Sequence, residues 1–144
     1  MAIALRGSDN GDTGIPPLTL NKPAGTVEGD LILITHCNDS ETSGTPPAGF
    51  ATVTGYPVDQ PIGVETTRLE VFYKVAGASE PATYDITGFS AQSSATIEVY
   101  YDTVGGGTWT VNAAATGNGT TSATAGPVTS TNNSRRRSNI NYTL

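Results

Sequence analysis

The segment 66–75, TTRLEVFYKV, constrains the fold of this chain more than any other. Its odd positions from Leu69 to Val75 are apolar or aromatic, and its even positions from 68 to 74 are charged except at Phe72. Side chains alternate between the two faces of an extended strand, so this pattern predicts a strand with one buried and one wetted face. Phe72 places a ring on the charged side, where it would contact a neighbouring loop or subunit, or lie on the surface.

The composition extends this prediction to the whole chain. Glycine (17 residues) and proline (9) are frequent and only 14% of residues are charged, which favours short strands and tight turns over helices. We therefore expect one all-β domain over 1–144, with 114–144 as its C-terminal segment, in the form of a jelly-roll-like β-sandwich or a small barrel. About eight to ten short strands are expected, at 2–5, 18–20, 30–37, 50–56, 66–75, 82–87, 93–102, 108–113, 127–131 and 140–144.

Two further segments refine the expected sheet. The run 30–37, DLILITHC, is apolar for four consecutive residues, which is typical of a strand covered on both faces. In 93–102 the odd positions from 95 to 101 are apolar and predicted to face inward, so Tyr100 faces outward between Glu98 and Asp102. An outward tyrosine in that setting suits either a subunit contact or a sugar-binding platform.

The charge of the chain argues against nucleic acid as a partner. The formal net charge is −6, and nucleic-acid binding needs a basic patch. The exception is Arg135, Arg136 and Arg137, which could touch nucleic acid or an acidic partner. The favoured interpretation is a solvated tail, or a patch that contacts acidic residues on a neighbouring subunit.

The sequence also predicts assembly in a reducing cytoplasm, away from membranes. Cys37 is the one cysteine, so no internal disulfide can form. The N-terminal residues lack a basic segment followed by a long apolar run, and no stretch approaches the roughly 18 apolar residues that a membrane span requires. Four N-x-[ST] sequons occur, at 38, 118, 132 and 141, and without export we expect no glycan on them.

No residue pattern predicts a catalytic, cofactor or metal site. His36 and Cys37 are neighbours on an expected strand and face opposite ways, and the chain has no second histidine or cysteine to complete a zinc site. Glu98 and Asp102, four residues apart on one strand, would be about 13 Å apart, too far for a glycosidase pair. The polar segment 7–14, GSDNGDTG, could offer oxygen ligands to a cation, but it lacks the EF-hand spacing and is expected to be a turn.

Four runs of sequence, taken together, resemble a β-rich domain of tailed-bacteriophage virion proteins, of the head decoration, head-fibre and tail-fibre type. The resemblance implies a structural building block of the particle, without catalytic residues to transfer. The usual continuation after the fourth run is shortened here, and the three arginines at 135–137 are not part of the pattern. The matching runs are LTLNKPAGTVEGDLILI (18–34), TPPAGF (45–50), RLEVFYKVAGASEPATYDIT (68–87) and ATIEVYYD (95–102).

The expected function that follows is a capsid decoration, or cement, protein. It would bind the major capsid protein on the outside of the assembled head, as a homotrimer, through candidate interface residues Phe72, Tyr100 and Arg135 to Arg137. The alternative is a carbohydrate-binding module of a phage fibre, which would use exposed aromatics such as Tyr100 and Trp109 and the loops 38–49 and 57–63. An enzyme such as a depolymerase is disfavoured, because no paired carboxylates or triad are visible in the sequence.

Overall fold

The structure is a computed structural model that describes residues 3–62, 65–105, 107–111, 124–131 and 139–143. Its described residues form strands and loops without a helix, which confirms the all-β prediction. The strands are β1 (Ile3–Thr13), β2 (Leu18–Asn21), β3 (Leu31–Asn38), β4 (Ala51–Thr52), β5 (Val58–Ile62), β6 (Glu65–Val75), β7 (Thr83–Ile86), β8 (Ser93–Asp102), β9 (Thr108–Val111), β10 (Thr124–Thr131) and β11 (Asn139–Thr143).

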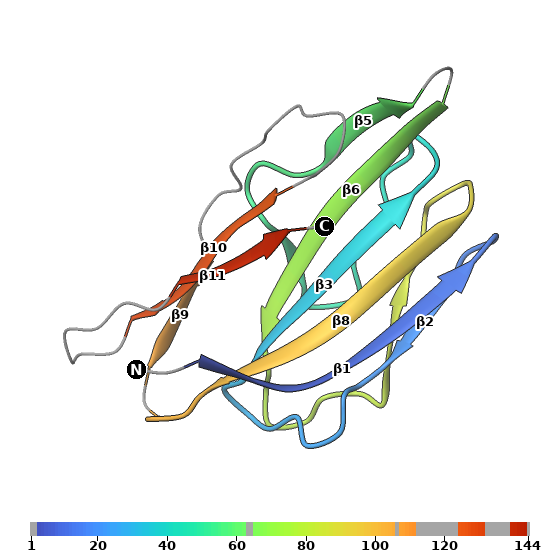
Figure 1. Cartoon of the computed structure of the whole chain (residues 1–144). Coiled ribbons are helices and arrows are strands. Elements are labelled where there is room, and N and C mark those ends of the chain that lie inside the picture. The colour runs from blue at the N-terminus through green and yellow to red at the C-terminus, as the bar shows by residue number, and fades with distance from the viewer. Residues whose placement is uncertain (1–2, 63–64, 106, 112–123, 132–138, 144) are drawn as a thin grey trace.

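The strands form three antiparallel sheets. The large sheet has the order β1-β8-β3-β6-β4, and β5 also pairs with β6. A two-stranded sheet, β2-β7, covers one face of the large sheet, and the sheet β11-β10-β9 lies over part of the other face (Figure 1). The fold is therefore a β-sandwich with β3 at its centre.

Both faces of the central strand are buried, as the apolar run 30–37 predicts. Ile32 and Ile34 point into the main core, between the large sheet and β2-β7. Leu31 and Leu33 point the other way, into a smaller cluster that Trp109 of β9 covers. The main core is completed by Leu18, Leu20, Phe50, Phe72, Ala76, Tyr84, Ile86, Phe89, Ala95, Ile97 and Val99.

The prediction of a wetted face on β6 is wrong. Phe72 is 1% exposed in the main core and Glu70, on the same face, is also buried. Leu69 and Val71 on the opposite face are buried too. A charged residue at every second position indicates a wetted face only where nothing covers that face, and here the β2-β7 layer and the loop 39–49 cover it.

The structure also moves several strand boundaries. The predicted loop 7–14 is mostly strand, because β1 continues to Thr13 and pairs with the whole length of β8. The predicted loop 57–63 contains β5, and the predicted strand 50–56 is reduced to β4. In each case pairing with a long neighbouring strand outweighs the local preference of turn-forming residues, since strand propensity depends strongly on context.

A buried carboxylate closes the turn before β3. Asp30 accepts two hydrogen bonds from the Arg6 guanidinium, at 2.6 and 3.0 Å, and one from the Val27 amide at 2.9 Å. The Arg6 guanidinium also lies 4.3 Å from the centre of the Tyr101 ring. The GD dipeptide of the first matching run is thus used to fix the start of β3 against β1.

A second buried carboxylate closes the turn after β6. Glu80 accepts hydrogen bonds from Lys74 Nζ at 2.9 Å, from the Gly77 amide at 2.7 Å and from the Tyr84 hydroxyl at 2.9 Å. Burial opposes ionisation of Glu80, but these donors outweigh it and leave the pKa of Glu80 below its usual value. Burial and the Glu80 carboxylate raise the pKa of Tyr84. The AGASEP turn is therefore held by its own glutamate.

Candidate functional site

A chain of three hydrogen-bonded side chains crosses three neighbouring strands inside the main core. Glu70 of β6 and His36 of β3 are direct cross-strand partners, and Glu70 Oε2 lies 2.9 Å from His36 Nδ1. His36 Nε2 lies 2.5 Å from Ser93 Oγ, at the start of β8. All three residues are at most 2% exposed. Because a carboxylate only accepts, Nδ1 of His36 donates to Glu70, and in the neutral imidazole Nε2 then accepts from the Ser93 hydroxyl.

The loop 39–49 closes over this chain. The Gly44 amide donates to Glu70 Oε2 at 2.8 Å, so the glutamate holds the loop as well as the histidine. A Cβ atom at position 44 would lie 2.8 Å from His36 Cε1, which explains the glycine at this close approach. The ring of Phe89, centred 5.5 Å from that of His36, forms another wall. The chain is thereby enclosed by backbone and aromatic rings.

The three side chains have the order of atoms found in a serine–histidine–acid triad, in which the acid orients the histidine and the histidine activates the hydroxyl. Ser93, however, is 2% exposed, so a substrate from solution does not reach its hydroxyl. Sequence reasoning considered His36 only beside Cys37 and missed both true partners. They are 34 and 57 residues away, and only strand register brings them together.

A fourth buried polar side chain, Asn38, lies next to the chain. Asn38 of β3 is the cross-strand partner of Ser93 on one side and of Arg68 on the other. Its Oδ1 accepts from the Ser40 amide at 3.0 Å and from the Ser40 hydroxyl at 2.9 Å. Its Nδ2 is buried and has no hydrogen-bond partner among the described residues. Buried polar atoms are almost always hydrogen-bonded, so this amide nitrogen is an exception.

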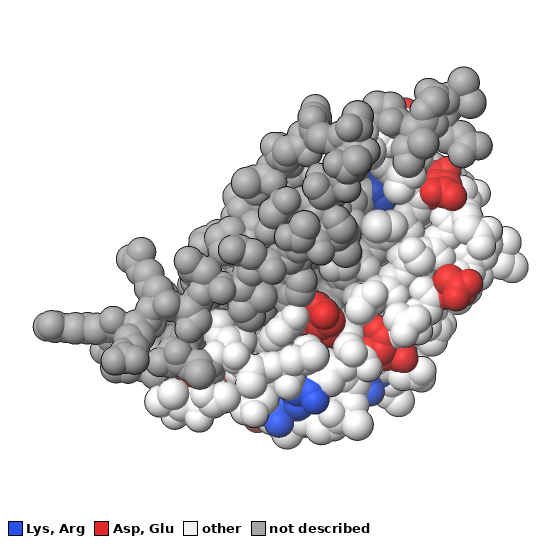
Figure 2. Space-filling model, viewed as in Figure 1, with Lys and Arg blue, Asp and Glu red and all other residues white. Residues whose placement is uncertain are grey.

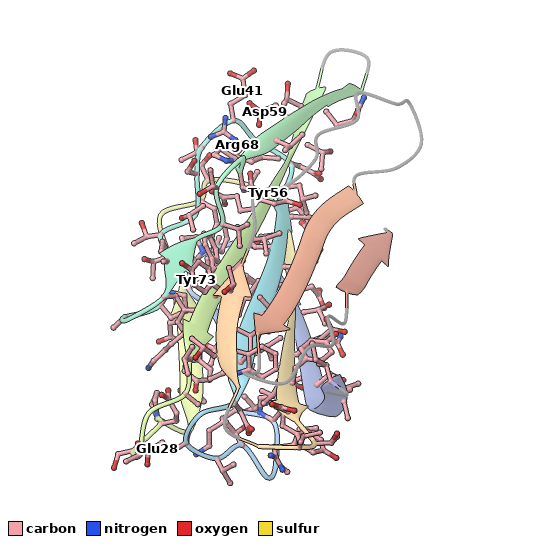
Figure 3. The ribbon with its side chains drawn as sticks, turned by 90° about the vertical axis from the view of Figure 1, so that its left-hand side faces the viewer. Glu28, Glu41, Tyr56, Asp59, Arg68 and Tyr73 are labelled. Carbon is pink, nitrogen blue, oxygen red and sulfur yellow. The ribbon has the colours of Figure 1, made fainter. Side chains whose placement is uncertain are left out.

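Above the buried chain, Arg68 joins the two loops that the sequence proposed as a recognition surface. Its guanidinium donates to both carboxylate oxygens of Asp59 at 2.7 Å, and to Ser43 Oγ at 2.9 Å. Glu41 lies nearby and accepts from Thr66 Oγ1 (Figure 3). The hydrogen bonds from Arg68 lower the pKa of Asp59 despite partial desolvation. The loops 38–49 and 57–63 therefore meet at one end of the sandwich.

The predicted interface aromatics are not on the surface. Phe72 lies in the main core, and Tyr100 is 8% exposed in the smaller cluster with Leu31 and Leu33. Trp109 is half-buried against that cluster, and its indole N–H donates to the Gly29 carbonyl at 2.8 Å. The inward orientation of Tyr100 comes from the β9 layer, which covers a face expected to be wet. The other predicted interface residues, Arg135, Arg136 and Arg137, lie outside the described residues.

The candidate cation ligands at 9–12 belong to β1 and do not converge. Asp9 accepts a hydrogen bond from the Asn21 amide at 2.7 Å. Within the described ranges, no group of three or more histidine, cysteine, aspartate or glutamate side chains could hold a metal ion. In the same residues, no helix is long and apolar enough to cross a membrane. The face seen in Figure 2 carries separate acidic side chains and few basic ones.

Comparisons with protein-family models, with curated proteins and with solved structures found no match for this chain.

Proposed function

We propose that this protein is a capsid decoration protein of a tailed bacteriophage, which binds the major capsid protein on the outside of the head and stabilises the shell without chemistry. The observation that carries the proposal is structural: conspicuous residues of the runs that resemble phage virion proteins hold the fold together. The carboxylate side chains of Asp30 and Glu80, in the GD and ASEP runs, are buried and hold turns of the sandwich. Side chains that stabilise the fold in this way are what we expect of a structural protein of the particle.

The exposed apolar residues suggest which end would contact the shell. Among the residues whose side chains the structure describes, four of the five large apolar side chains that are about half exposed or more lie at the end where β6 and β8 finish and β3 begins. We call these four residues the apolar end, and Ile15 is the fifth, at the opposite end. Exposed apolar side chains concentrated at one end of a molecule make that end a candidate protein contact surface. The apolar end consists of Leu5, Val27, Val75 and Val104.

Topology and edges support the finer parts of the proposal. The strands β1, β8, β3 and β6 lie side by side in the large sheet while β2 and β7 face them, so the chain passes repeatedly between layers, as in a jelly roll. Along its outer edge, β1 has no strand partner among the described residues. A free edge of this length is usually covered, and a homotrimer on the virion, assembled in the host cytoplasm, would cover it.

Cosedimentation of the purified protein with empty, expanded capsids, in parallel with isolated host-surface polysaccharide, tests the proposal. Saturable binding to shells at a fixed copy number, with none to the polysaccharide, is expected. The double variant Val27→Asp/Val104→Asp should lose most of this binding, and Ile15→Asp, the same change at the opposite end, should keep it. Absence of binding by the wild-type protein rejects the function, whereas equal binding by all variants rejects only the apolar end as the contact.

The second candidate function is a carbohydrate-binding module of a phage fibre. One observation favours it: Arg68 brings the loops 38–49 and 57–63 together, with the half-buried Tyr56 close below them (Figure 3). Polar groups beside an aromatic ring are the usual parts of a sugar site. The version of this hypothesis that uses Tyr100 and Trp109 has lost its support, because Tyr100 is buried. Binding to polysaccharide alone, abolished by Tyr56→Ala, would select this function.

A further inference from the structure

The buried chain Glu70–His36–Ser93 is closed to substrates from solution, yet the strand register places a carboxamide residue, Asn38, directly opposite its serine. Asn38 and Ser93 are direct partners in the antiparallel pair β3–β8. The Asp39 amide donates to the Gln92 carbonyl at 3.0 Å, so the pair 38/93 is of the non-hydrogen-bonded kind. In such pairs the Cα atoms are only about 4.5 Å apart and both side chains leave the same face.

The hydrogen bonds of the Asn38 carboxamide orient it as an electrophile that a nucleophile attacks. Ser40 donates to Asn38 Oδ1 from its amide and from its hydroxyl. A backbone N–H can only donate, so the atom facing it is the oxygen and the orientation of the amide is fixed. Two donors on one carbonyl oxygen form an oxyanion hole. The nitrogen Nδ2, the group that would leave, is buried and without a hydrogen-bond partner among the described residues.

The hydroxyl of Ser93 is held as a nucleophile would be. His36 Nε2 accepts its proton at 2.5 Å, and Glu70 orients the ring through Nδ1 at 2.9 Å. The Gly44 amide donates to the same carboxylate oxygen, Glu70 Oε2, at 2.8 Å. The nucleophile, the base, the orienting acid and the carboxamide of Asn38 are thus all buried on neighbouring strand positions, and the half-buried Ser40 supplies the donors to the carbonyl oxygen.

We propose that this site makes an internal ester cross-link between Ser93 Oγ and Asn38 Cγ. Ser93 Oγ attacks Cγ as its proton passes to His36 Nε2, and the oxyanion is stabilised by Ser40. The Cγ–Nδ2 bond then breaks, the nitrogen takes the proton from His36, and ammonia leaves. A hydroxyl and a carboxamide become an ester and ammonia, so the step needs no oxidant, reductant or other reactant.

The link is compatible with the strand geometry. An ester joins two Cβ atoms through three bonds, as a disulfide does, and disulfides hold their Cβ atoms about 3.8 Å apart. A non-hydrogen-bonded pair starts with its Cβ atoms at roughly 4.5–5.5 Å, so the ends of β3 and β8 must approach each other slightly. Asn38 is the last residue of β3 and Ser93 the first of β8, so both lie next to loops that can absorb this shift. The product is a covalent staple between two central strands.

The intact mass of the full chain, measured after denaturation, tests this proposal directly. After incubation of the folded protein at neutral pH we expect a loss of about 17 Da, the mass of ammonia, and a proteolytic fragment in which residues 38 and 93 are joined. Hydroxylamine, which cleaves esters, should separate the two peptides. An unchanged mass would overturn the proposal, as would a gain of about 1 Da, which marks simple hydrolysis of the amide.

Variants assign the roles. Ser93→Ala and Asn38→Asp should abolish the loss of ammonia, while Ser94→Ala, the exposed neighbour on the other face, should leave it unchanged. Ser40→Ala retains the backbone donor and should slow the reaction by roughly 10²-fold, the usual effect of removing one oxyanion donor. Loss of ammonia from Ser93→Ala would overturn the assignment. The wild-type mass and fragment map decide the question even where a variant does not fold. The proposal is independent of any partner of the protein.

Discussion

Two halves of one buried face are built from different chemistry. Toward the ends of β6 and β8, the face of the large sheet that meets β2-β7 is mainly apolar, with Ile32, Ile34 and Val99 among its residues. Toward the ends of β3 and β5, the same face carries His36, Asn38, Glu70 and Ser93, all buried. The two halves are equally enclosed and lie on the same strands, so burial alone does not explain their composition.

The two halves differ in what the loss of one contact costs. Apolar contacts are non-directional, and their contribution follows the area removed from water. A buried hydrogen-bonded group contributes little net stability when paired but costs much when its partner is lost. The apolar half therefore stabilises the sandwich, whereas the polar half fixes one arrangement of strands and of the loop 39–49 above them. The following predictions test that division.

The largest effect is expected in the apolar core itself. Phe72→Ala should lower the free energy of unfolding by about 3–5 kcal/mol, because it removes a fully buried ring and leaves a cavity. Val75→Ala, on the same strand but about half exposed, serves as the control and should cost less than about 1 kcal/mol. Denaturant unfolding measures both, and similar losses for the two variants would mean that the packing around Phe72 is loose.

In the polar half, loss of one partner should be costly and strongly coupled. Glu70→Ala leaves the His36 ring and the Gly44 amide without their acceptor and should cost about 3 kcal/mol. Adding His36→Ala should cost less than the sum of the single changes, with a coupling of about 1 kcal/mol or more in a double-mutant cycle. Strict additivity would contradict a shared network.

The turn glutamate extends the comparison to pH. The pKa of Glu80 is lowered in the folded state, so the stability it contributes is present above its usual pKa, about 4.5, and is lost as pH falls toward the folded value. Glu80→Gln should cost about 1.5 kcal/mol near neutral pH and should flatten the fall in melting temperature below about pH 5. A variant with the wild-type acid profile would assign that fall to other carboxylates.

The smallest effect is expected for the ion pair at the loop end. Arg68 binds Asp59 with two hydrogen bonds, but the aspartate is 42% exposed. Arg68→Ala should therefore cost no more than about 1 kcal/mol. A double-mutant cycle with Asp59→Ala measures the pair alone, and raising the salt concentration should weaken it. A coupling well above about 1 kcal/mol would mean that this ion pair stabilises the fold more than its exposure predicts.

Strand positions could be predicted from the sequence because period-two patterns are local. The strand expected at 93–102 matches β8 at both ends, and those expected at 30–37 and 66–75 match β3 and β6 to within one residue. The orientation of Phe72 and Tyr100 could not be predicted, because it depends on the layers that cover each face. Those layers, β2-β7 and β9, come from other strands, and the alternating pattern within one strand does not show how they pack on it.

The buried polar chain was outside the reach of sequence reasoning for a related reason. Glu70 is an ordinary charged position in an alternating pattern, and Ser93 is one of two serines at the start of an expected strand. Their meeting with His36 depends on the register of three antiparallel strands, which the turns and bulges of the whole fold determine. The one available signal was a histidine at the end of an apolar run. It indicates that the histidine has hydrogen-bond partners but does not show which residues they are.

The hydrogen bond from Trp109 to the Gly29 carbonyl also makes the intrinsic fluorescence of Trp109 a probe of how β9 packs. Trp109 is the chain's single tryptophan, so all indole emission reports on the packing of β9 against the large sheet. A red shift of that emission before the loss of β-sheet circular dichroism would show the outer layer lifting from an intact sandwich. Coincident signals would show that the third layer and the sandwich unfold as one cooperative unit.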